Sequence, residues 1–408
     1  MEMIVRGGKR LSGEVRISGS KNGALPILFA TLITKGVSRI ENLPDIGDIR
    51  VAIRLLEGFG AKMLRSGVAL YIDTEHLTYR EPDPTLVSQI RASSYLIGAC
   101  LARFGKFTLS NFGGCSFSNR PIDMHLYAAE ALGARIENDV LLTDGLKGAE
   151  IVFDKPSVGA TVNAIIMASL SDGETHIHTY AKEPHIFTLV EFLKSCGADI
   201  EINDGKITVI GRHLHGGDAR ICGDMIEAGT YLSMGVITSG KVTVKGVFCR
   251  EMTTFIDFLR CFGAKITTLS DSVTVESCEE KLYTKVVAEP YPGFPTDMQP
   301  LCAPLMAFGR GGEIYDFVWR ERFGYLAALS KFGVVSKRNG CGAVIYPSNL
   351  SYADVTAPDL RGAAACLLCA LHACGESQIK SAEILLRGYE HPDEKLRSLG
   401  ADVRILNN

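Results

Sequence analysis

The sequence lacks the features that would tie it to a membrane or to a nucleic acid. No apolar run in its 408 residues is long enough to span a bilayer. The first thirty residues show no charged head followed by an apolar block and a cleavage site. Lys and Arg form no cluster of the kind that neutralises a row of phosphates, and the formal net charge is only −3. We therefore expect a cytoplasmic protein with no membrane segment and no nucleic-acid partner.

Three patterns that indicate cofactors or cross-links are also missing. Neither GxGxxG after a strand nor a GKS or GKT phosphate loop occurs. His176 with His178, and His213 with His215, have no Cys or carboxylate partner at metal-site spacing and are more typical of surface strands. The 12 cysteines are scattered in apolar company, as in residues 364–369. We expect no cofactor, no metal and no disulfide framework.

The overall composition is that of a folded globular protein. Hydrophobic residues make up 46% of the chain and charged residues 22%, which is far from the low hydrophobicity and high charge of disordered proteins. At a typical domain size of about 150 residues, this length predicts two or three domains.

What the sequence does contain is an internal repeat. A helix that ends at a glycine and is followed by a strand recurs six times at spacings of 64 to 73 residues. These glycines are Gly60, Gly133, Gly197, Gly263, Gly333 and Gly400. Helix capping explains each glycine but not the regular spacing. The clearest copy, residues 148–211, has the pattern of strand, helix, strand, helix and a closing hairpin.

We therefore predict six βαβαββ units, of which the second has a weak first strand. Their ranges are 13–73, 85–143, 148–211, 218–276, 285–346 and 352–406. Three such units are enough to close one small domain, so the expected fold is α/β with two domains of three units each.

Charged and small polar residues gather at equivalent points of these units. The starts of the first helices of the six units carry, in order, Lys21 with Asn22, Arg91, Ser157 with Gly159, Asp224 with Glu227, Thr296 with Asp297, and Asp359 with Arg361. The turn that enters the second helix of the sixth unit carries Arg387. Ordinary capping covers Asp224 and Glu227. Cations at a helix start are unfavourable unless an anion lies there too, so Lys21, Arg91, Arg361 and Arg387 favour a site for a small, strongly anionic ligand.

The longest irregular stretch within a unit, residues 111–121, contains Cys115 and Arg120. It predicts a mobile lid, in which nearby cations favour the thiolate of Cys115. A single loop cysteine is a weak signal, so the residues alone leave the reactivity of Cys115 open.

A family resemblance runs from residue 3 to residue 404 and is carried by nine segments. In order they are SGSKNGALPI, IRAS, GGCSFSNRPIDMHL, DKPSVGAT, MIEAGTYL, FPTDMQ, RERF, DLRGAA and RGYEHPDEKLRSLGAD. Together they resemble the UDP-N-acetylglucosamine enolpyruvyl transferase family, also called UDP-N-acetylglucosamine 1-carboxyvinyltransferases. The resemblance implies a two-domain inverse α/β barrel with domains at 21–224, which carries the lid, and at 1–20 plus 225–408, and an active site in the cleft between them.

The resemblance also implies the reaction. The family transfers the enolpyruvyl group of phosphoenolpyruvate to the 3′-hydroxyl of UDP-N-acetylglucosamine and releases phosphate, through a tetrahedral ketal and without a cofactor or metal. This is the first committed step of peptidoglycan synthesis, and the family is the target of fosfomycin. The oligomeric state stays open between a monomer and a weak homo-oligomer.

Residue roles follow from the same resemblance. Cys115 matches the general acid and covalent-adduct residue, and Asp297 matches the proposed base. The implied anion contacts are Lys21, Arg120 and Arg387 to the phosphate, Arg322 and Arg361 on the carboxylate side, and Arg91 in the same pocket. The implied nucleotide contacts are Pro121, Ile122, Asp123, Met124, Lys155, Ser157, Val158 and Gly159, with Asn22 and Val318 near the sugar.

Three positions depart from the family pattern. Ser118 stands where Gly is usual, Tyr95 where a Trp-like residue is usual, and Met225 where Arg is usual. Ser118 restricts a backbone that Gly leaves free, so we expect an active but slower enzyme.

Three other functions compete with this interpretation. The sister enzyme that acts on shikimate 3-phosphate shares the repeat but lacks the lid cysteine and the SVGAT segment. An RNA 3′-phosphate cyclase would need a nucleotidylated His and a basic RNA surface. A non-catalytic UDP-sugar-binding paralogue is supported only by the three departures.

Overall fold

The chain, seen as a computed structural model, is described for residues 1–109, 112–113, 121–203, 205–277 and 280–406. It forms two compact units. The terminal unit consists of the described residues of 1–18 and 223–408, and the internal unit of those of 19–113 and 121–222. Along the described residues, the chain passes from one unit to the other after Ser18 and after Cys222.

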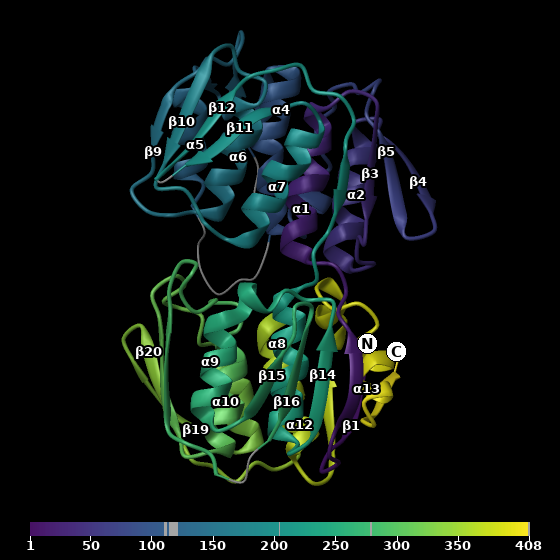
Figure 1. Ribbon diagram of the computed structural model, residues 1–408, viewed down its shortest axis with the longest axis vertical. Helices are drawn as coiled ribbons and strands as arrows, with labels where there is room; N and C mark the ends of the chain where they lie inside the picture. The colour runs from purple at the N-terminus through teal and green to yellow at the C-terminus, as the bar shows by residue number, and fades with distance from the viewer. Residues whose placement is uncertain (110–111, 114–120, 204, 278–279, 407–408) are drawn as a thin grey trace. The chain divides into compact units, whose positions relative to one another are not determined.

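The terminal unit has helices at its centre and sheets around them (Figure 1). The inner helices are α8 (Met225–Ile237), α10 (Gln299–Phe308) and α12 (Leu360–His372), and their residues are almost all buried. Such helices are apolar on every side because protein surrounds them. The other helical segments are α9 (Thr253–Phe262), α11 (Tyr325–Leu329), α13 (Pro392–Ser398), η3 (Cys249–Met252), η4 (Ser330–Phe332) and η5 (Ala382–Arg387).

Three four-stranded sheets cover these helices. The first has the order β21 (Asp354–Thr356), β22 (Glu376–Lys380), β1 (Glu2–Arg6) and β23 (Asp402–Leu406). The second has the order β15 (Lys265–Thr268), β16 (Ser272–Glu276), β14 (Lys241–Lys245) and β2 (Ser12–Arg16). The third has the order β17 (Thr284–Ala288), β18 (Gly312–Asp316), β20 (Gly342–Tyr346) and β19 (Val335–Asn339).

The internal unit repeats this plan. Its inner helices are α1 (Lys21–Ala30), α4 (Leu96–Phe104) and α6 (Val158–Ala168). Its other helical segments are α2 (Gly47–Gly58), α3 (Pro84–Val87), α5 (Asp123–Ala131), α7 (Pro184–Ser195), η1 (Thr31–Ile33) and η2 (Arg91–Tyr95).

Its sheets are two of four strands and one of three. The orders are β13 (Asp218–Arg220), β3 (Val37–Glu41), β5 (Ala69–Asp73), β4 (Lys62–Ser66); then β11 (Asp199–Asn203), β12 (Lys206–Ile210), β10 (Glu174–His178), β9 (Glu150–Val152); then β6 (Lys106–Thr108), β8 (Val140–Leu142), β7 (Arg135–Glu137). In the four-stranded sheets of this unit, the edge strand β13 runs parallel to β3 and the edge strand β9 runs parallel to β10. The closing hairpins β4–β5 and β11–β12 are antiparallel and also pair antiparallel with β3 and β10.

The predicted repeat is confirmed at its glycines. All six repeat glycines have a positive φ, from +92° at Gly333 and Gly400 to +111° at Gly263. This is the left-handed conformation that ends a helix and that residues with a Cβ adopt at a cost.

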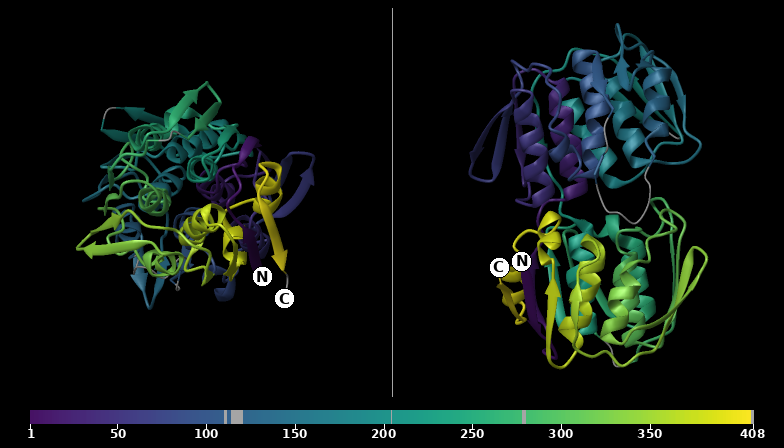
Figure 2. Two further views of the ribbon diagram at one scale, coloured as in Figure 1. Left: turned by 90° about the horizontal axis from the view of Figure 1, so that it is seen from below. Right: turned by 180° about the vertical axis from the view of Figure 1, so that it is seen from behind.

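The prediction was wrong about which strands pair. The strand before each chain crossing stays in the unit where it begins, so β2 completes the sheet of β14–β16 and β13 completes the sheet of β3–β5. The first strands of the first and fourth predicted units are thus exchanged. The sixth predicted unit contains only one of the two closing strands, β23. The place of the other closing strand is taken by β1, from the start of the chain, which pairs antiparallel with β22 and β23. Figure 2 shows both termini on the same side of the terminal unit.

The second predicted unit begins with a helical turn instead of a strand. Residues 84–87 form α3, with Asp83 capping it and Pro84 at its first position, so the sheet of this unit has three strands. A proline at a helix start is favourable because its missing N–H has no helical partner there.

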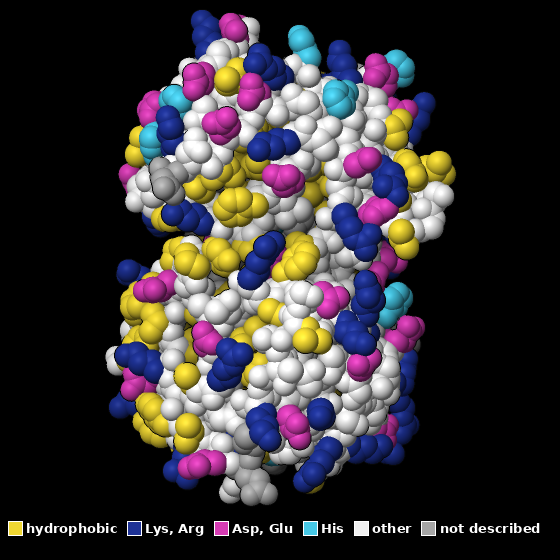
Figure 3. Space-filling view, viewed as in Figure 1, with side chains coloured by type: hydrophobic (Ala, Val, Ile, Leu, Met, Phe, Trp, Pro, Cys, Tyr) yellow, Lys and Arg dark blue, Asp and Glu magenta, His cyan; other side chains and the backbone are white. Residues whose placement is uncertain are grey.

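Other sequence expectations concern the surface and the thiols. Acidic and basic side chains alternate over the face shown in Figure 3. In the part of the chain that the structure describes, every helix falls short of the length and apolarity needed to cross a membrane. The ten described cysteines are free thiols.

Candidate functional site

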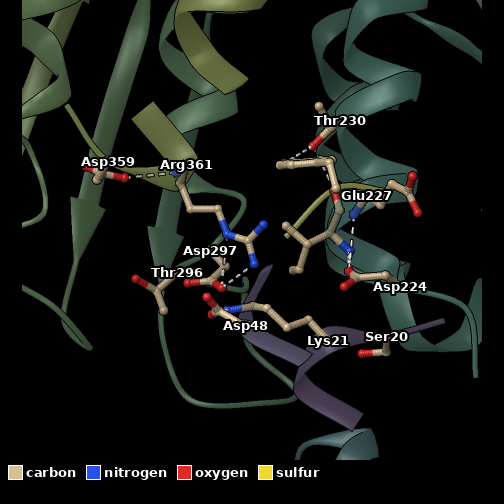
Figure 4. A network of polar contacts seen from close by, with 12 residues as sticks. Ser20, Lys21, Asp48, Asp224, Glu227, Thr230, Thr296, Asp297, Asp359 and Arg361 are labelled. Carbon is tan, nitrogen blue, oxygen red and sulfur yellow. Dashed lines mark hydrogen bonds and ion pairs between the residues drawn. The ribbon is translucent and has the colours of Figure 1, made fainter. Parts of the chain in front are cut away.

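The carboxylate of Asp297 is held by two buried arginines of the terminal unit. Arg322 donates from Nη1 to Oδ1 over 2.6 Å, and Arg361 donates from Nη2 and Nε to Oδ2 over 2.9 and 3.2 Å. Figure 4 shows the Arg361 guanidinium pointing at Asp297. The side chains of Arg322 and Arg361 are 7% and 6% exposed, and that of Asp297 is 23% exposed. Two guanidinium groups in this arrangement suit a ligand carboxylate as well.

Burial and charge act in opposite directions on Arg361. Burial is the largest single influence and would lower the pKa of this guanidinium, but Asp297, together with Tyr389 and Asp224, outweighs burial, and the pKa is raised. The side chain also lies over the ring of Tyr389, 5.9 Å from its centroid. Arg361 is the second residue of α12, whose start is capped by Asp359 through the N–H groups of Arg361 and Gly362 at 2.9 and 3.0 Å.

Asp297 does not lie at a helix start as the repeat predicts. Helix α10 begins at Gln299, and Thr296 and Asp297 lie in the turn before it. The Thr296 hydroxyl accepts a hydrogen bond from Nη1 of Arg322 over 3.1 Å and donates one to Oδ2 of Asp316 over 2.6 Å. The turn thus places Asp297 against the two arginines.

A buried acid, Glu227, forms a second polar network in the terminal unit. Nζ of Lys395 donates to Oε1 of Glu227 over 2.6 Å, and the N–H of Ser18 donates to Oε2 over 2.8 Å. Asp224 caps α8 through the N–H groups of Ile226 and Glu227 at 2.8 and 3.2 Å, as expected. Capping does not explain Glu227, whose carboxylate instead holds the last residue before the first chain crossing.

In the internal unit, Lys21 has an acidic partner at the start of α1. Its Nζ donates to Oδ2 of Asp48 over 3.2 Å, and Ser20 caps the helix through the N–H of Gly23 over 3.1 Å. Asp48 lies in the first turn of α2 and is 5% exposed. The anion expected beside a cation at a helix start is thus supplied here by the chain, as Asp297 supplies it for Arg361. A cation at the start of a helix therefore does not by itself require a bound ligand at Lys21 or Arg361, because a carboxylate of the chain already lies beside each of them.

Arg91 begins η2 and reaches the segment before α5. Its Nη2 donates to the carbonyl oxygen of Pro121 over 3.3 Å, and its guanidinium lies 6.0 Å from the ring centroid of Phe112. Burial lowers the pKa of Arg91. These contacts hold one predicted anion-binding residue beside the predicted nucleotide segment.

The predicted helix start at Ser157 is confirmed. Ser157 is the N-cap of α6, its hydroxyl accepts from the N–H of Ala160 over 3.4 Å, and Val158 and Gly159 are the first helical residues. A helix start presents N–H groups and a positive dipole end, which suit a phosphate group.

Asn163, fully buried in α6, ties together the elements around that helix start. Its Oδ1 accepts from the N–H of Gly98 over 3.0 Å, and its Nδ2 donates to the carbonyl of Ser94 over 2.9 Å and to Nδ1 of His125 over 2.6 Å. One amide therefore fixes α4, η2 and α5 relative to α6.

His125 is a neutral, immobilised ring that faces Gly159. Burial and the charge of Arg91 lower the pKa of His125 to about 4. Because Nδ1 accepts from Asn163, the proton of the neutral ring is on Nε2. A Cβ at Gly159 would lie 2.8 Å from Cε1 and 2.9 Å from Nε2 of this ring. A glycine is therefore needed at this position of α6.

Replacing Gly159 with Ala is expected to lower the free energy of unfolding by about 1 to 3 kcal/mol, because the added methyl overlaps a ring that cannot move aside. Gly58→Ala is the matched control, since a Cβ there meets nothing within 4 Å at the end of α2. The control is expected to be neutral or to stabilise by up to about 1 kcal/mol. Urea unfolding of both variants measures the difference, and wild-type stability in Gly159→Ala would contradict this packing.

The remaining predicted residues lie at varied depths. Lys155, Pro121 and Asp123 are exposed, and Asn22, Ile122, Met124, Val158, Val318 and Arg387 are half-buried. Cys115 and Arg120, together with most of the expected lid at 111–121 and with Ser118, lie outside the described residues.

Of the departures, Tyr95 packs edge-on against Phe29 with centroids 6.1 Å apart, and Met225 packs on the core of the terminal unit. His176 and His178 lie on strand β10, and their acidic neighbours are Glu174 of the same strand and Glu150 of β9. Within the described ranges, no group of three or more His, Cys, Asp or Glu has a geometry that would hold a metal ion.

Sequence reasoning missed four residues that organise these sites: Asp316, Asn163, His125 and Lys395. Asp316, Asn163 and His125 are polar residues at buried positions of β18, α6 and α5, whereas Lys395 is one of several charged residues of α13. The available signal was weak: a buried pattern position occupied by a polar side chain that would need a partner.

Comparison with known proteins agrees with this organisation. The family model described as EPSP synthase (3-phosphoshikimate 1-carboxyvinyltransferase) matches residues 5–396. The UDP-N-acetylglucosamine 1-carboxyvinyltransferase of Halothermothrix orenii is 37% identical over 99% of this chain and 99% of its own length. The protein of the same name from Prosthecochloris aestuarii is 39% identical over 100% of this chain and 98% of its own.

Solved structures give the same result for the fold. The enolpyruvyl transferase NikO from Streptomyces tendae superimposes with a TM-score of 0.89 at 26% identity, covering 99% of this chain and 98% of NikO. An EPSP synthase from Acinetobacter baumannii, at 16% identity, has a TM-score of 0.74 over all of both chains and supports the fold alone. The expected two-domain inverse α/β barrel fold is thereby confirmed. The chain belongs to the UDP-N-acetylglucosamine 1-carboxyvinyltransferase family of enolpyruvyl transferases.

Proposed function

We propose that this chain transfers the enolpyruvyl group of phosphoenolpyruvate to the 3′-hydroxyl of UDP-N-acetylglucosamine and releases phosphate. The observation that carries the proposal is the Asp297 carboxylate, which Arg322 and Arg361 hold. It occurs in a chain whose full-length relatives are named UDP-N-acetylglucosamine 1-carboxyvinyltransferase. We further propose that the reaction takes place in the cytoplasm and begins peptidoglycan synthesis, and hence serves cell-wall growth and division.

The chemistry needs an acid, a base and a cation clamp. A proton is added to the CH₂ carbon of phosphoenolpyruvate while the sugar hydroxyl attacks the adjacent carbon, giving a tetrahedral ketal. The Cys115 thiolate left by the first step then takes a proton from the new methyl group, and the bond to phosphate breaks, which restores the double bond and releases phosphate. In this proposal Cys115 supplies the proton and Asp297 receives the hydroxyl proton. Lys21, Arg120 and Arg387 stabilise the phosphate, and none of these steps uses a cofactor or a metal.

The contacts of Asp297 connect substrate binding to catalysis. A carboxylate held by two guanidinium groups is a weak base, because protonation would break both ion pairs. In this proposal the carboxylate of phosphoenolpyruvate competes for Arg322 and Arg361. Its binding therefore weakens the hold on Asp297 and makes that carboxylate a stronger base when the substrate is present.

The nucleotide would bind on the internal unit. The α6 start at Ser157, Val158 and Gly159 suits the diphosphate, and Lys155 lies just before it. Pro121, Ile122, Asp123 and Met124, at the start of α5, would contact the uridine side, with Arg91 holding the segment through Pro121. Asn22 and Val318 would lie near the sugar.

The decisive experiment measures phosphate release from phosphoenolpyruvate with UDP-N-acetylglucosamine, with shikimate 3-phosphate, and with neither. We expect release with the UDP-sugar only, and a loss of turnover to background in Cys115→Ala. Cys261→Ala, at an exposed thiol of α9, is the matched control and should keep the wild-type rate. UDP-N-acetylglucosamine should also accelerate alkylation of Cys115 by fosfomycin.

Other results would redirect the proposal. Release with shikimate 3-phosphate alone would assign the sister activity. Binding of UDP-N-acetylglucosamine without any release would indicate a binding paralogue, and a wild-type rate in Cys115→Ala would remove that residue as the acid.

A further inference from the structure

Asp316 is a fully buried carboxylate at the end of β18 that contacts two segments of the site, the turn at Thr296 and the turn at Val318 and Trp319. Its Oδ2 accepts from the Thr296 hydroxyl over 2.6 Å, and its Oδ1 accepts from the N–H groups of Val318 and Trp319 over 3.0 and 2.7 Å. Burial raises the pKa of Asp316, and the hydrogen bond from Thr296, the two N–H groups and the charge of Arg322 act against that rise. These donors favour the charged carboxylate.

The two oxygens of Asp316 serve different segments. Oδ1 fixes the backbone turn that carries Val318. Oδ2 orients the Thr296 hydroxyl so that its lone pairs face Arg322, which donates to it over 3.1 Å from the same Nη1 that donates to Asp297. The hydroxyl can accept from Arg322 in this geometry because its own proton is already taken by Asp316.

We propose that Asp316 is a positioning residue, which acts through Thr296 to fix Arg322 against the Asp297 carboxylate and through its other oxygen to set the turn at Val318. It touches neither substrate in the proposed reaction. The inference rests on the proposed function for its catalytic consequence, but the fixing of Arg322 is a property of the folded chain and can be measured separately.

Four variants separate the two tasks. Thr296→Val removes the relay hydroxyl and keeps the shape, whereas Thr296→Ser keeps the hydroxyl and is the matched control. Asp316→Asn keeps an acceptor for the turn but replaces Oδ2 with an NH₂ group. Asp316→Ala loses both tasks.

The kinetic expectation is a split between kcat and KM. Thr296→Val and Asp316→Asn should each lower kcat by about 10- to 100-fold with little change in the KM for UDP-N-acetylglucosamine, since about 1 Å of misplacement has effects of this size. Asp316→Ala should also raise that KM, because the turn at Val318 is released. Thr296→Ser should stay close to wild type.

The double variant Asp316→Asn with Thr296→Val tests the relay itself. If the effect passes through the hydroxyl, the double variant is no slower than the slower single variant. Multiplied effects would overturn the relay, as would a wild-type kcat in Thr296→Val. A general loss of stability would not make the effects of the two substitutions on kcat non-additive. Urea unfolding of each variant measures its stability independently.

A readout without substrates separates this inference from the proposed function. In protein labelled with ¹⁵N-arginine, the Arg322 side-chain signal is assigned by its loss in Arg322→Lys. We expect restricted guanidinium rotation in wild type and Thr296→Ser, and faster rotation in Thr296→Val and Asp316→Asn. Unchanged rotation in both latter variants would refute the fixing of Arg322. A wild-type enzyme that releases no phosphate would refute only the proposed function.

Discussion

Replacing Asp297 with Ala is expected to lower kcat by about 10²- to 10⁴-fold and to reduce the free energy of unfolding by about 3 kcal/mol. The first effect is the loss of the proposed general base. The second arises because Arg322 and Arg361, 7% and 6% exposed, would remain buried without the carboxylate that compensates them. Phosphate release and urea unfolding measure the two effects.

Asp257→Ala provides a comparison at an exposed ion pair. Asp257 pairs with Arg260 on the surface of α9, where both side chains are about half exposed. Its loss should cost less than about 1 kcal/mol and leave kcat unchanged. If Asp297→Ala were no more damaging than this control, both the base and the buried ion-pair cluster would be misassigned.

The second large effect is a pH dependence of stability that is centred on Glu227. Burial raises the pKa of this carboxyl to about 7, and Lys395 and the N–H of Ser18 only partly offset burial. A carboxyl with a raised pKa binds its proton more tightly in the folded state than in the unfolded state. Its contribution is therefore fully present below about pH 4.5 and is lost as the pH rises to about 7.

The comparison of wild type with Glu227→Gln isolates this contribution. The stability of wild type relative to this variant should fall by about 3 kcal/mol between about pH 4.5 and pH 7.5, as the raised pKa requires. Urea unfolding across that range measures it. A flat difference for Glu227→Gln would mean that the carboxyl titrates normally.

The sequence predicted what depends on local patterns. The six glycines at positive φ and the cap at Ser157 are properties of a few neighbouring residues, so they could be read directly. Local patterns also predicted β2 and β13 as strands, but not their partners. Pairing was decided by where the chain crosses between units, which no local pattern records.

The same distinction holds for the site. The sequence identified Arg361 and Asp297 as charged residues at equivalent points, but their contact joins positions 64 residues apart. Asn163 looked like one polar residue in an apolar helix, and only the fold shows that its amide meets three other elements. Polar residues that act by holding others carry little signal until the partners are in place.

Strand β1, between β22 and β23, has a consequence for how the protein is made. The internal unit is complete once the ribosome has added Cys222, so it can fold while synthesis continues. Strand β1 must instead wait for much later residues, because Glu2–Arg6 pair with Glu376–Lys380 and Asp402–Leu406. The terminal unit can therefore close only after β22 and β23 have been synthesised, and until then β1 lacks these two neighbours.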